Sequence, residues 1–172
     1  MTHPTPLAAR AAGALLLIHA AAALPSAAHA QTASSTLSVS ATVTANCTVS
    51  TSALAFGNVN TLSGSNVDST GGLSVTCTNG TAWAASAGIG AGSGASFSAR
   101  RMSAGSNLLS YNLFTDSSRT SVWGDGTGST ATIAGTGSGT AQAVTIYGRV
   151  SSGQTSAPAG SYADTVAVTI TY

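Results

Sequence analysis

Residues that could carry out acid–base chemistry are scarce in this chain. All three histidines lie before residue 31, and beyond that point the sequence contains no Lys and no Glu. The ionisable side chains that follow are four Asp, four Arg, four Tyr and two Cys. Hydrolases and transferases usually rely on a His, Glu or Lys whose pKa lies near neutrality. The composition therefore argues against an enzyme, and we expect no catalytic residues and no cofactor.

Cys47 and Cys77 are the remaining reactive pair. A zinc site would need two further ligands, and no His is present after residue 30 to supply one. In an oxidising compartment two cysteines flanked by strand-forming residues most simply form a disulfide. The sequence predicts a Cys47–Cys77 disulfide and no metal site.

An oxidising compartment is indicated by the first thirty residues. A weakly positive start with Arg10 is followed by an apolar stretch and by Ala28-His29-Ala30, which is the pattern of a secretory signal peptide with an A-x-A cleavage site. His19 and Pro25 leave the apolar stretch too short for a membrane-spanning helix. We expect residues 1–30 to be removed on export.

The remaining chain, residues 31–172, has four Arg and four Asp, so its side chains carry no net charge. Nucleic-acid binding and docking on anionic membranes both require a Lys/Arg-rich surface. The sequence therefore predicts no nucleic-acid partner and no docking on anionic membranes. No segment after residue 30 is apolar enough to span a membrane, so we also expect no membrane insertion.

Period-two alternation of apolar and polar residues runs through residues 31–172, with breaks at Gly, Ser and Asn, and this pattern predicts an all-β sandwich. The clearest strand ends the chain, with Val166, Val168, Ile170 and Tyr172 on one face. Residues 144–150 alternate in the same way just upstream, which makes these two segments candidates for pairing. Residues 108–114 and 119–123 are two further expected strands.

A tight turn is expected at Asn79-Gly80, because this dipeptide favours the positive φ angles of a hairpin. The segment of residues 81–89 would then pair back onto the strand that contains Leu73, Val75 and Cys77. Trp83 and Trp123 are expected in the core, because large aromatic rings are usually buried. Asp164 interrupts an apolar run and is expected to bond to a loop.

Residues 31–45 form a separate arm in the sequence. Leu37, Val39, Ala41 and Val43 alternate with Ser and Thr, as in a strand with one buried side. The pattern fits an ordinary first strand of the sandwich. It fits equally well a donor strand that completes the sheet of another molecule by β-augmentation.

From Cys47 onward the chain resembles the spore coat protein U domain, the fold shared by archaic chaperone-usher pilins of the Csu type. The matching pieces are NCTV at 46–49, LAFG at 54–57, GLSVTCT at 72–78, RM at 101–102, LSYNLFTD at 109–116, WGDG at 123–126, IYGRV at 146–150 and PAGSYADTV at 158–166, followed by the strand that ends at Tyr172. Each piece is weak alone, but their order and coverage make the resemblance specific.

The resemblance implies an immunoglobulin-like β-sandwich that lacks its last strand, formed by residues 46–172, with residues 31–45 as an N-terminal donor strand. It implies that a periplasmic chaperone first fills the open groove, and that the arm of another subunit replaces the chaperone at an outer-membrane usher. Val166, Val168, Ile170 and Tyr172 would form the groove wall and the docking strand for the chaperone. The protein would be a pilus subunit at the cell surface that serves adhesion and biofilm formation.

Two alternatives remain open. A secreted spore or cell coat protein of the same domain family would share the fold. A carbohydrate-binding β-sandwich would need Trp83 or Trp123 exposed as a stacking platform, which their expected place in the core disfavours.

Overall fold

The computed structural model describes residues 29–172, so the expected signal peptide lies almost entirely outside the described residues. The chain divides into two units, Met1–Ser40 and Ala41–Tyr172. Within the first unit, residues 29–40 have no regular secondary structure and are exposed. All strands belong to the second unit, which is all-β in its described residues.

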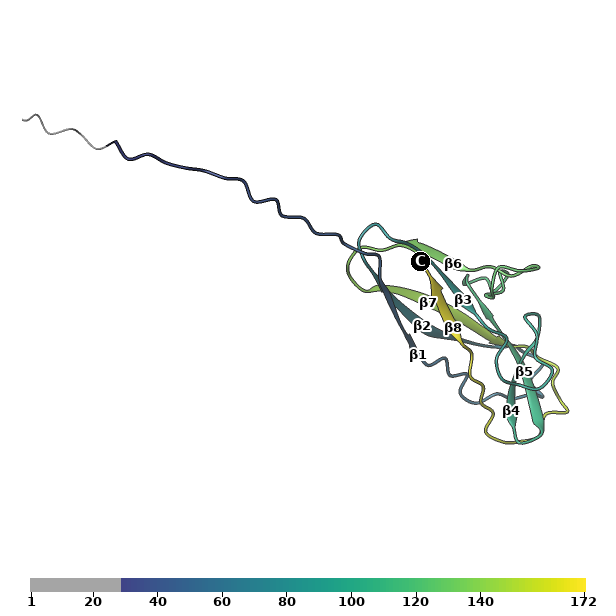
Figure 1. The fold of residues 1–172 in the computed structure, drawn as a ribbon. Coiled ribbons are helices and arrows are strands. Elements are labelled where there is room, and N and C mark those ends of the chain that lie inside the picture. Colours follow the sequence, from purple (N-terminus) through teal and green to yellow (C-terminus); the bar gives the residue numbers. More distant parts are fainter. Residues whose placement is uncertain (1–28) are drawn as a thin grey trace, which may run out of the picture. The chain divides into compact units, whose positions relative to one another are not determined.

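The second unit is a sandwich of two antiparallel sheets (Figure 1). The larger sheet has the order β1-β2-β7-β5-β4 and the smaller one the order β6-β3-β8. The strands are β1 (Cys47–Ser52), β2 (Val67–Cys77), β3 (Ala82–Ala87), β4 (Arg100–Ala104), β5 (Asn107–Phe114), β6 (Ile133–Thr136), β7 (Gln142–Val150) and β8 (Val168–Thr171).

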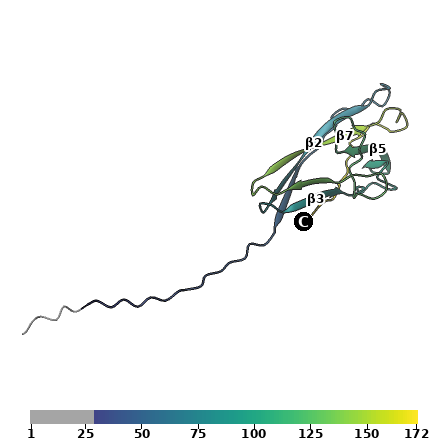
Figure 2. The ribbon, with the colours of Figure 1, turned by 90° about the horizontal axis from the view of Figure 1, so that it is seen from above.

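The core lies between the two sheets, which are seen as separate layers in Figure 2. Alternate residues of each strand point inward, as the period-two pattern predicts. The buried side chains are Leu73, Val75, Cys77, Trp83, Ala85, Ala87, Leu109, Tyr111, Leu113, Trp123, Ile146 and Val150. Trp83 and Trp123 are thus core residues, and neither can serve as a stacking platform for a carbohydrate.

The Cys47–Cys77 disulfide is present and joins the start of β1 to the end of β2. In the β1–β2 ladder Cys47 is the direct partner of Cys77. The predicted pairing of the two cysteines is confirmed.

The hairpin expected at Asn79-Gly80 is not formed. Gly80 has the expected positive φ of 81°, but β2 and β3 belong to different sheets. Both edges of β2 are occupied, by β1 and by β7. The turn therefore carries the chain across the sandwich, and Gly80 N donates a 2.8 Å hydrogen bond to Gly137 O near β6.

The last two strands are not partners either. β7 lies between β2 and β5, so it has no free edge, and β8 pairs with β3 in the opposite sheet. The strand expected at residues 119–123 is also absent: only isolated bridges occur there, at Val122 and Trp123. Asp116 holds this segment in a turn by accepting hydrogen bonds from the backbone N–H groups of Thr120 and Ser121.

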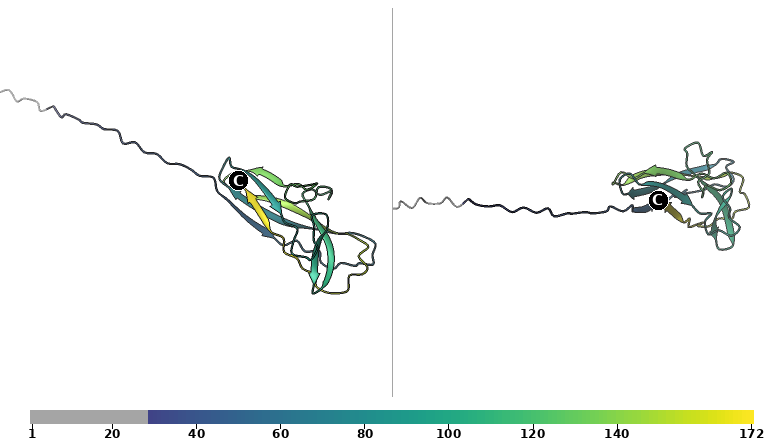
Figure 3. Two further views of the ribbon diagram at one scale, coloured as in Figure 1. Left: turned by 45° about the vertical axis from the view of Figure 1, so that its right-hand side comes forward. Right: turned by 45° about the horizontal axis from the view of Figure 1, so that its top comes forward.

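β8 is one of the two edge strands of the smaller sheet, and β1 is one of the two edge strands of the larger sheet. They lie side by side on the same flank of the sandwich (Figures 1 and 3). In the described part of the chain they do not pair with each other. The sandwich is therefore open along this flank.

Candidate functional site

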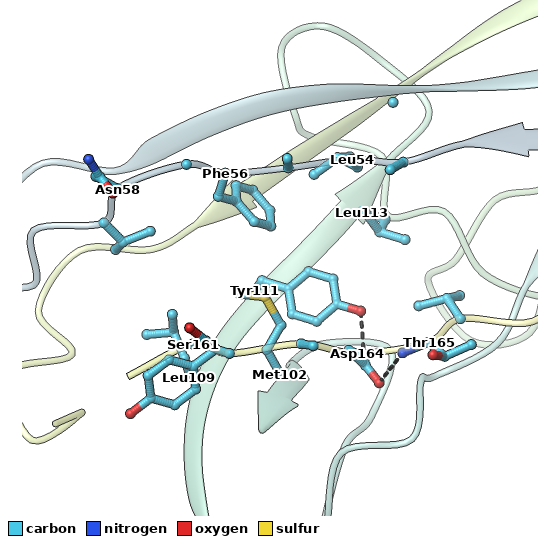
Figure 4. A pocket seen from close by; sticks show the side chains of 18 of the residues that line it. Leu54, Phe56, Asn58, Met102, Leu109, Tyr111, Leu113, Ser161, Asp164 and Thr165 are labelled. Carbon is cyan, nitrogen blue, oxygen red and sulfur yellow. Dashed lines mark hydrogen bonds between the residues drawn. The ribbon is translucent and has the colours of Figure 1, made fainter. Parts of the chain in front are cut away.

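A groove of about 1010 Å³ opens on the unpaired flank. One wall runs from the end of β1 along residues 51–62, and the other runs along residues 157–168 to the first residue of β8. The floor consists of core side chains, namely Leu109, Tyr111, Leu113, Trp123 and Ile146. Figure 4 shows Leu54 and Phe56 on one side, Ser161, Asp164 and Thr165 on the other, and Tyr111 between them.

The first wall packs against glycines of the larger sheet. A Cβ atom on Gly148 would lie 2.8 Å from Leu54 Cδ1 and 3.0 Å from Phe56 Cζ. A Cβ atom on Gly71 would lie 2.9 Å from Leu54 Cβ. Because these positions carry no side chain, Leu54 and Phe56 can lie directly on the strands and form an apolar wall.

The ring of Phe56 in the first wall and the ring of Tyr111 in the floor meet edge to face. The ring centroids of Phe56 and Tyr111 are 6.0 Å apart, and the ring planes are inclined by 65°. This is a favourable arrangement for aromatic rings. It fixes the first wall against β5.

The second wall is tied to both sheets. Ala163 exchanges two backbone hydrogen bonds with Ser103 of β4, at 2.9 and 3.1 Å. Further along, Ala167 O accepts a 2.9 Å hydrogen bond from Gly88 N, at the end of β3. The segment therefore crosses from the larger sheet to the smaller one and enters β8.

Asp164 is the polar anchor of this wall. Its Oδ2 accepts a 2.7 Å hydrogen bond from the Tyr111 hydroxyl, and its Oδ1 accepts hydrogen bonds from the N–H groups of Ala91 and Thr165. Burial, followed by the hydrogen bond to Asp164, raises the pKa of the Tyr111 hydroxyl. The expected bond from Asp164 to a loop is therefore present, in the loop after β3.

Arg100 is fully buried behind this wall. It donates hydrogen bonds to the carbonyl oxygens of Gly88 and Trp123 and to Asn112 Oδ1. Burial lowers the pKa of its guanidinium from the ordinary value. These bonds tie β4 to the end of β3 and to the segment around Trp123, so Arg100 has a structural role.

The residues predicted for the groove wall are placed as follows. Val166 and Val168 line the groove. Ile170 and Tyr172 do not line it: Ile170 is half-buried against the core, and Tyr172 is 57 % exposed. The Tyr172 hydroxyl lies 3.5 Å from Asn46 Oδ1, across the flank from β8 to the start of β1. The groove therefore extends beside residues 157–168 and does not reach the disulfide.

The four arm residues predicted as a donor strand, Leu37, Val39, Ala41 and Val43, are all exposed. Leu37, Val39 and Val43 are 88 %, 84 % and 84 % exposed, respectively. No strand forms in residues 31–46.

Sequence reasoning missed Leu54, Phe56, Tyr111 and Leu62 as groove residues. Leu54 and Phe56 lie in an irregular segment with no strand pattern, and only the inward glycines Gly71 and Gly148 hint at side chains that need space. Among residues 29–172 there is no cluster of His, Cys, Asp or Glu suited to a metal ion. Within the same residues, no helix is long and apolar enough to cross a membrane.

In a comparison with protein families, the Spore Coat Protein U domain matches residues 33–169. No curated protein sequence matches the chain. A similar solved structure is the crystal structure of the CsuC-CsuE chaperone-tip adhesion subunit pre-assembly complex from archaic chaperone-usher Csu pili of Acinetobacter baumannii.

The similarity to that structure has a TM-score of 0.51 at 23% sequence identity. It covers 76% of this chain, which spans only 41% of the matched chain's length. At this identity the similarity concerns the fold, and it agrees with the immunoglobulin-like sandwich expected from the sequence.

Proposed function

Because the chain belongs to the spore coat protein U domain family, we propose that it is a structural subunit of an archaic chaperone-usher pilus. Each subunit would receive a strand from one neighbour and give its own arm to the next. The observation that carries this proposal is the open groove, which has core side chains as its floor and a second wall that leads into β8, on a chain that also has an uncharged, alternating arm.

The groove has the properties of a strand acceptor. β8 is an edge strand, and an exposed edge is a template for pairing with another chain. Of the residues that line the groove, only Asp164 is charged, and its carboxylate already accepts three hydrogen bonds. An added strand would find backbone partners along β8 and apolar side chains below it, which is the β-augmentation mode of recognition.

The arm has the matching properties. Residues 31–46 contain no charged residue, and Leu37, Val39, Ala41 and Val43 would share one face of an extended strand. Burying Leu37, Val39 and Val43 would contribute roughly 1.5 to 3 kcal/mol each, with less from Ala41. The ladder of backbone hydrogen bonds would add to this.

Assembly would need partners, because an unpaired strand edge such as that of β8 is prone to pair with other chains and aggregate. The similar solved structure is a complex of a chaperone with a pilus subunit. We assign the same kind of partner to this chain: a periplasmic chaperone would dock on Val166, Val168, Ile170 and Tyr172. An outer-membrane usher would then exchange it for the arm of another subunit. Residues 1–30 would be the export signal, residues 31–45 the donor arm and residues 46–172 the pilin domain.

This exchange would produce a filament. Giving and receiving a strand through different surfaces is a head-to-tail contact, and such contacts build open filaments unless the rotation closes a ring. The filament would lie at the cell surface and serve adhesion and biofilm formation. The role would be structural, without enzymatic activity.

The family description favours one second candidate, a secreted coat protein built from the same domain. Neighbouring genes for a chaperone and an usher would distinguish the pilus subunit from the coat protein.

The test is to produce the chain in a periplasm with its cognate chaperone and usher, and to analyse it by SDS gel electrophoresis without heating. We expect a ladder of polymers. A variant that lacks residues 32–44 should give monomers, and so should a control that replaces these residues by a Gly/Ser segment of equal length. A stable monomer from the unaltered chain would contradict the proposal.

A further inference from the structure

Four large hydrophobic side chains are more than three-quarters exposed in residues 29–172. Three of them, Leu37, Val39 and Val43, belong to the arm, and the fourth is Leu62, which is 79 % exposed. Leu62 lies in the connection between β1 and β2 and borders the groove. Among residues 29–172, the most exposed large apolar side chains thus belong to the proposed donor and to the rim of the proposed acceptor.

The exposure of Leu62 follows from how its turn is built. Leu62 N donates to Asn60 Oδ1 at 3.0 Å, and the hydroxyl and the backbone N–H of Ser63 both donate to Asn60 O. Gly57 and Gly64 flank this turn with φ angles of 65° and 67°, a conformation that favours glycine. The turn is held by its own hydrogen bonds, so the fold does not require a leucine at its tip.

Leu62 borders the end of the groove away from the disulfide. Cys47 pairs with Cys77 at one end of the β1–β2 ladder. The connection that contains Leu62 leads into Val67, at the other end of β2, where Val67 is the partner of Val150. An incoming strand would therefore pass Leu62 at the end of the groove away from the disulfide.

We infer that Leu62 packs on the donor arm of the neighbouring subunit, at the end of the arm that contains Val43, and retains the inserted strand. This inference rests on the proposed function. Neither the arm nor residues 57–66 carry a charge, so the contact would be apolar. The arm from Leu37 to Val43 would span about 20 Å as a strand, the length of an equal number of residues along the β8 edge.

The direction of the arm follows from the sheets. All ladders between the named strands are antiparallel. β8 runs toward Tyr172, which lies beside Asn46 at the disulfide end. An arm added antiparallel to β8 would place Leu37 at the disulfide end and Val43 at the end that Leu62 borders.

The first experiment compares Leu62→Ser with the control Ile89→Ser in the full chain, produced with chaperone and usher. Ile89 is partly exposed but does not line the groove. We expect the unaltered chain and both variants to form the SDS-resistant ladder. On warming in SDS, Leu62→Ser polymers should release monomers about tenfold faster than the other two, since loss of a buried leucine contact typically exceeds a tenfold effect.

The second experiment measures contact directly by cysteine cross-linking. Polymers of Leu62→Cys/Val43→Cys should form a covalent ladder that survives heating without reductant. Leu62→Cys/Leu37→Cys and each single variant should not.

The outcomes separate the two proposals. If the unaltered chain gives no ladder, the proposed function fails and this inference with it. If the ladder forms but Leu62→Ser polymers dissociate like the unaltered ones and no Leu62–Val43 cross-link appears, the inference is overturned and the proposed function stands. A fall in the urea midpoint of the Leu62→Ser monomer that matches the loss in its polymers would also overturn it, because Leu62 would then act within the fold.

Discussion

Tyr111 donates a 2.7 Å hydrogen bond to Asp164, and this bond joins the floor of the groove to its C-terminal wall. Tyr111 lies on β5 of the larger sheet, while Asp164 belongs to the segment that leads into β8 of the smaller sheet. The open flank is thus held in shape by a polar contact beneath an apolar lining.

Removal of this bond should destabilise the fold. We expect Tyr111→Phe to lower the free energy of unfolding by about 1–2 kcal/mol, because the half-buried carboxylate of Asp164 loses a hydrogen-bond donor. Urea unfolding monitored by circular dichroism measures this. Tyr147→Phe is the matched control, since its hydroxyl has no hydrogen bond to any of residues 29–172, and an equal loss in both variants would contradict the role of the bond.

Stability should be nearly independent of pH from about pH 5 to pH 9, because residues 31–172 contain no His, Glu or Lys side chain. The pKa values of Asp68, Asp116 and Asp125 are lowered, chiefly by hydrogen bonds from Arg149, from the Ser121 N–H and from the Thr127 hydroxyl, respectively. Their contribution is present above the unfolded Asp pKa of about 3.9 and is lost as pH falls through the lower folded values.

At alkaline pH the change of stability with pH has the opposite sign. The raised pKa of Tyr111 keeps its hydroxyl protonated in the folded chain after an unfolded tyrosine has ionised. Its contribution is therefore complete below about pH 10 and is lost as pH rises further. Urea midpoints measured from pH 2 to pH 11 check both limits. A midpoint that changes steeply between pH 6 and pH 8 would contradict this assignment.

Gly148 should be intolerant of substitution because its missing side chain makes room for the groove wall. Gly148→Ala would place a Cβ atom within 3.0 Å of Leu54 and Phe56, and we expect a cost of about 1–3 kcal/mol from overpacking. Gly160→Ala is the control, since its Cβ atom would meet Ala104 only at 3.6 Å. Urea unfolding should separate the two variants, and equal midpoints would show that the wall does not depend on this glycine.

The disulfide should contribute strongly to stability. It links residues 30 positions apart in sequence, and closing such a loop is worth roughly 3.5–4 kcal/mol in the chain-entropy model. We expect the Cys47→Ser/Cys77→Ser variant to lose about this amount in urea unfolding, and the unaltered chain to lose the same amount on reduction. A loss below about 1 kcal/mol would argue against this contribution.

Local patterns were sufficient to predict several features of the fold. The alternation at Val168 and Ile170 predicted a strand there, and Cys47 and Cys77 were paired correctly because each lies in a strand-forming segment. The partners of the strands could not be predicted in this way. Asn79-Gly80 specifies a reversal of the chain, but which edge of β2 is free depends on β1 and β7, which are distant in sequence.

Only some of the residues that line the groove could be predicted from the sequence. Alternation predicted a strand at Val166 and Val168, and the family resemblance implied their place on the groove wall, whereas Leu54 and Phe56 lie in a segment without periodicity. Their position depends on Gly71 and Gly148, which come from two different strands. Such a wall exists only after the sheet has formed, so no window of local sequence contains its signal.

The most direct test of strand donation compares two neighbouring arm positions that would face opposite sides of an inserted strand. Val39→Asp would place a charge in the groove, whereas Ser40→Asp would place the same charge in solvent. Both variants should be produced with chaperone and usher and analysed by SDS gel electrophoresis without heating. We predict that Ser40→Asp forms the polymer ladder and Val39→Asp does not. Equal ladders from both variants would contradict strand donation by the arm.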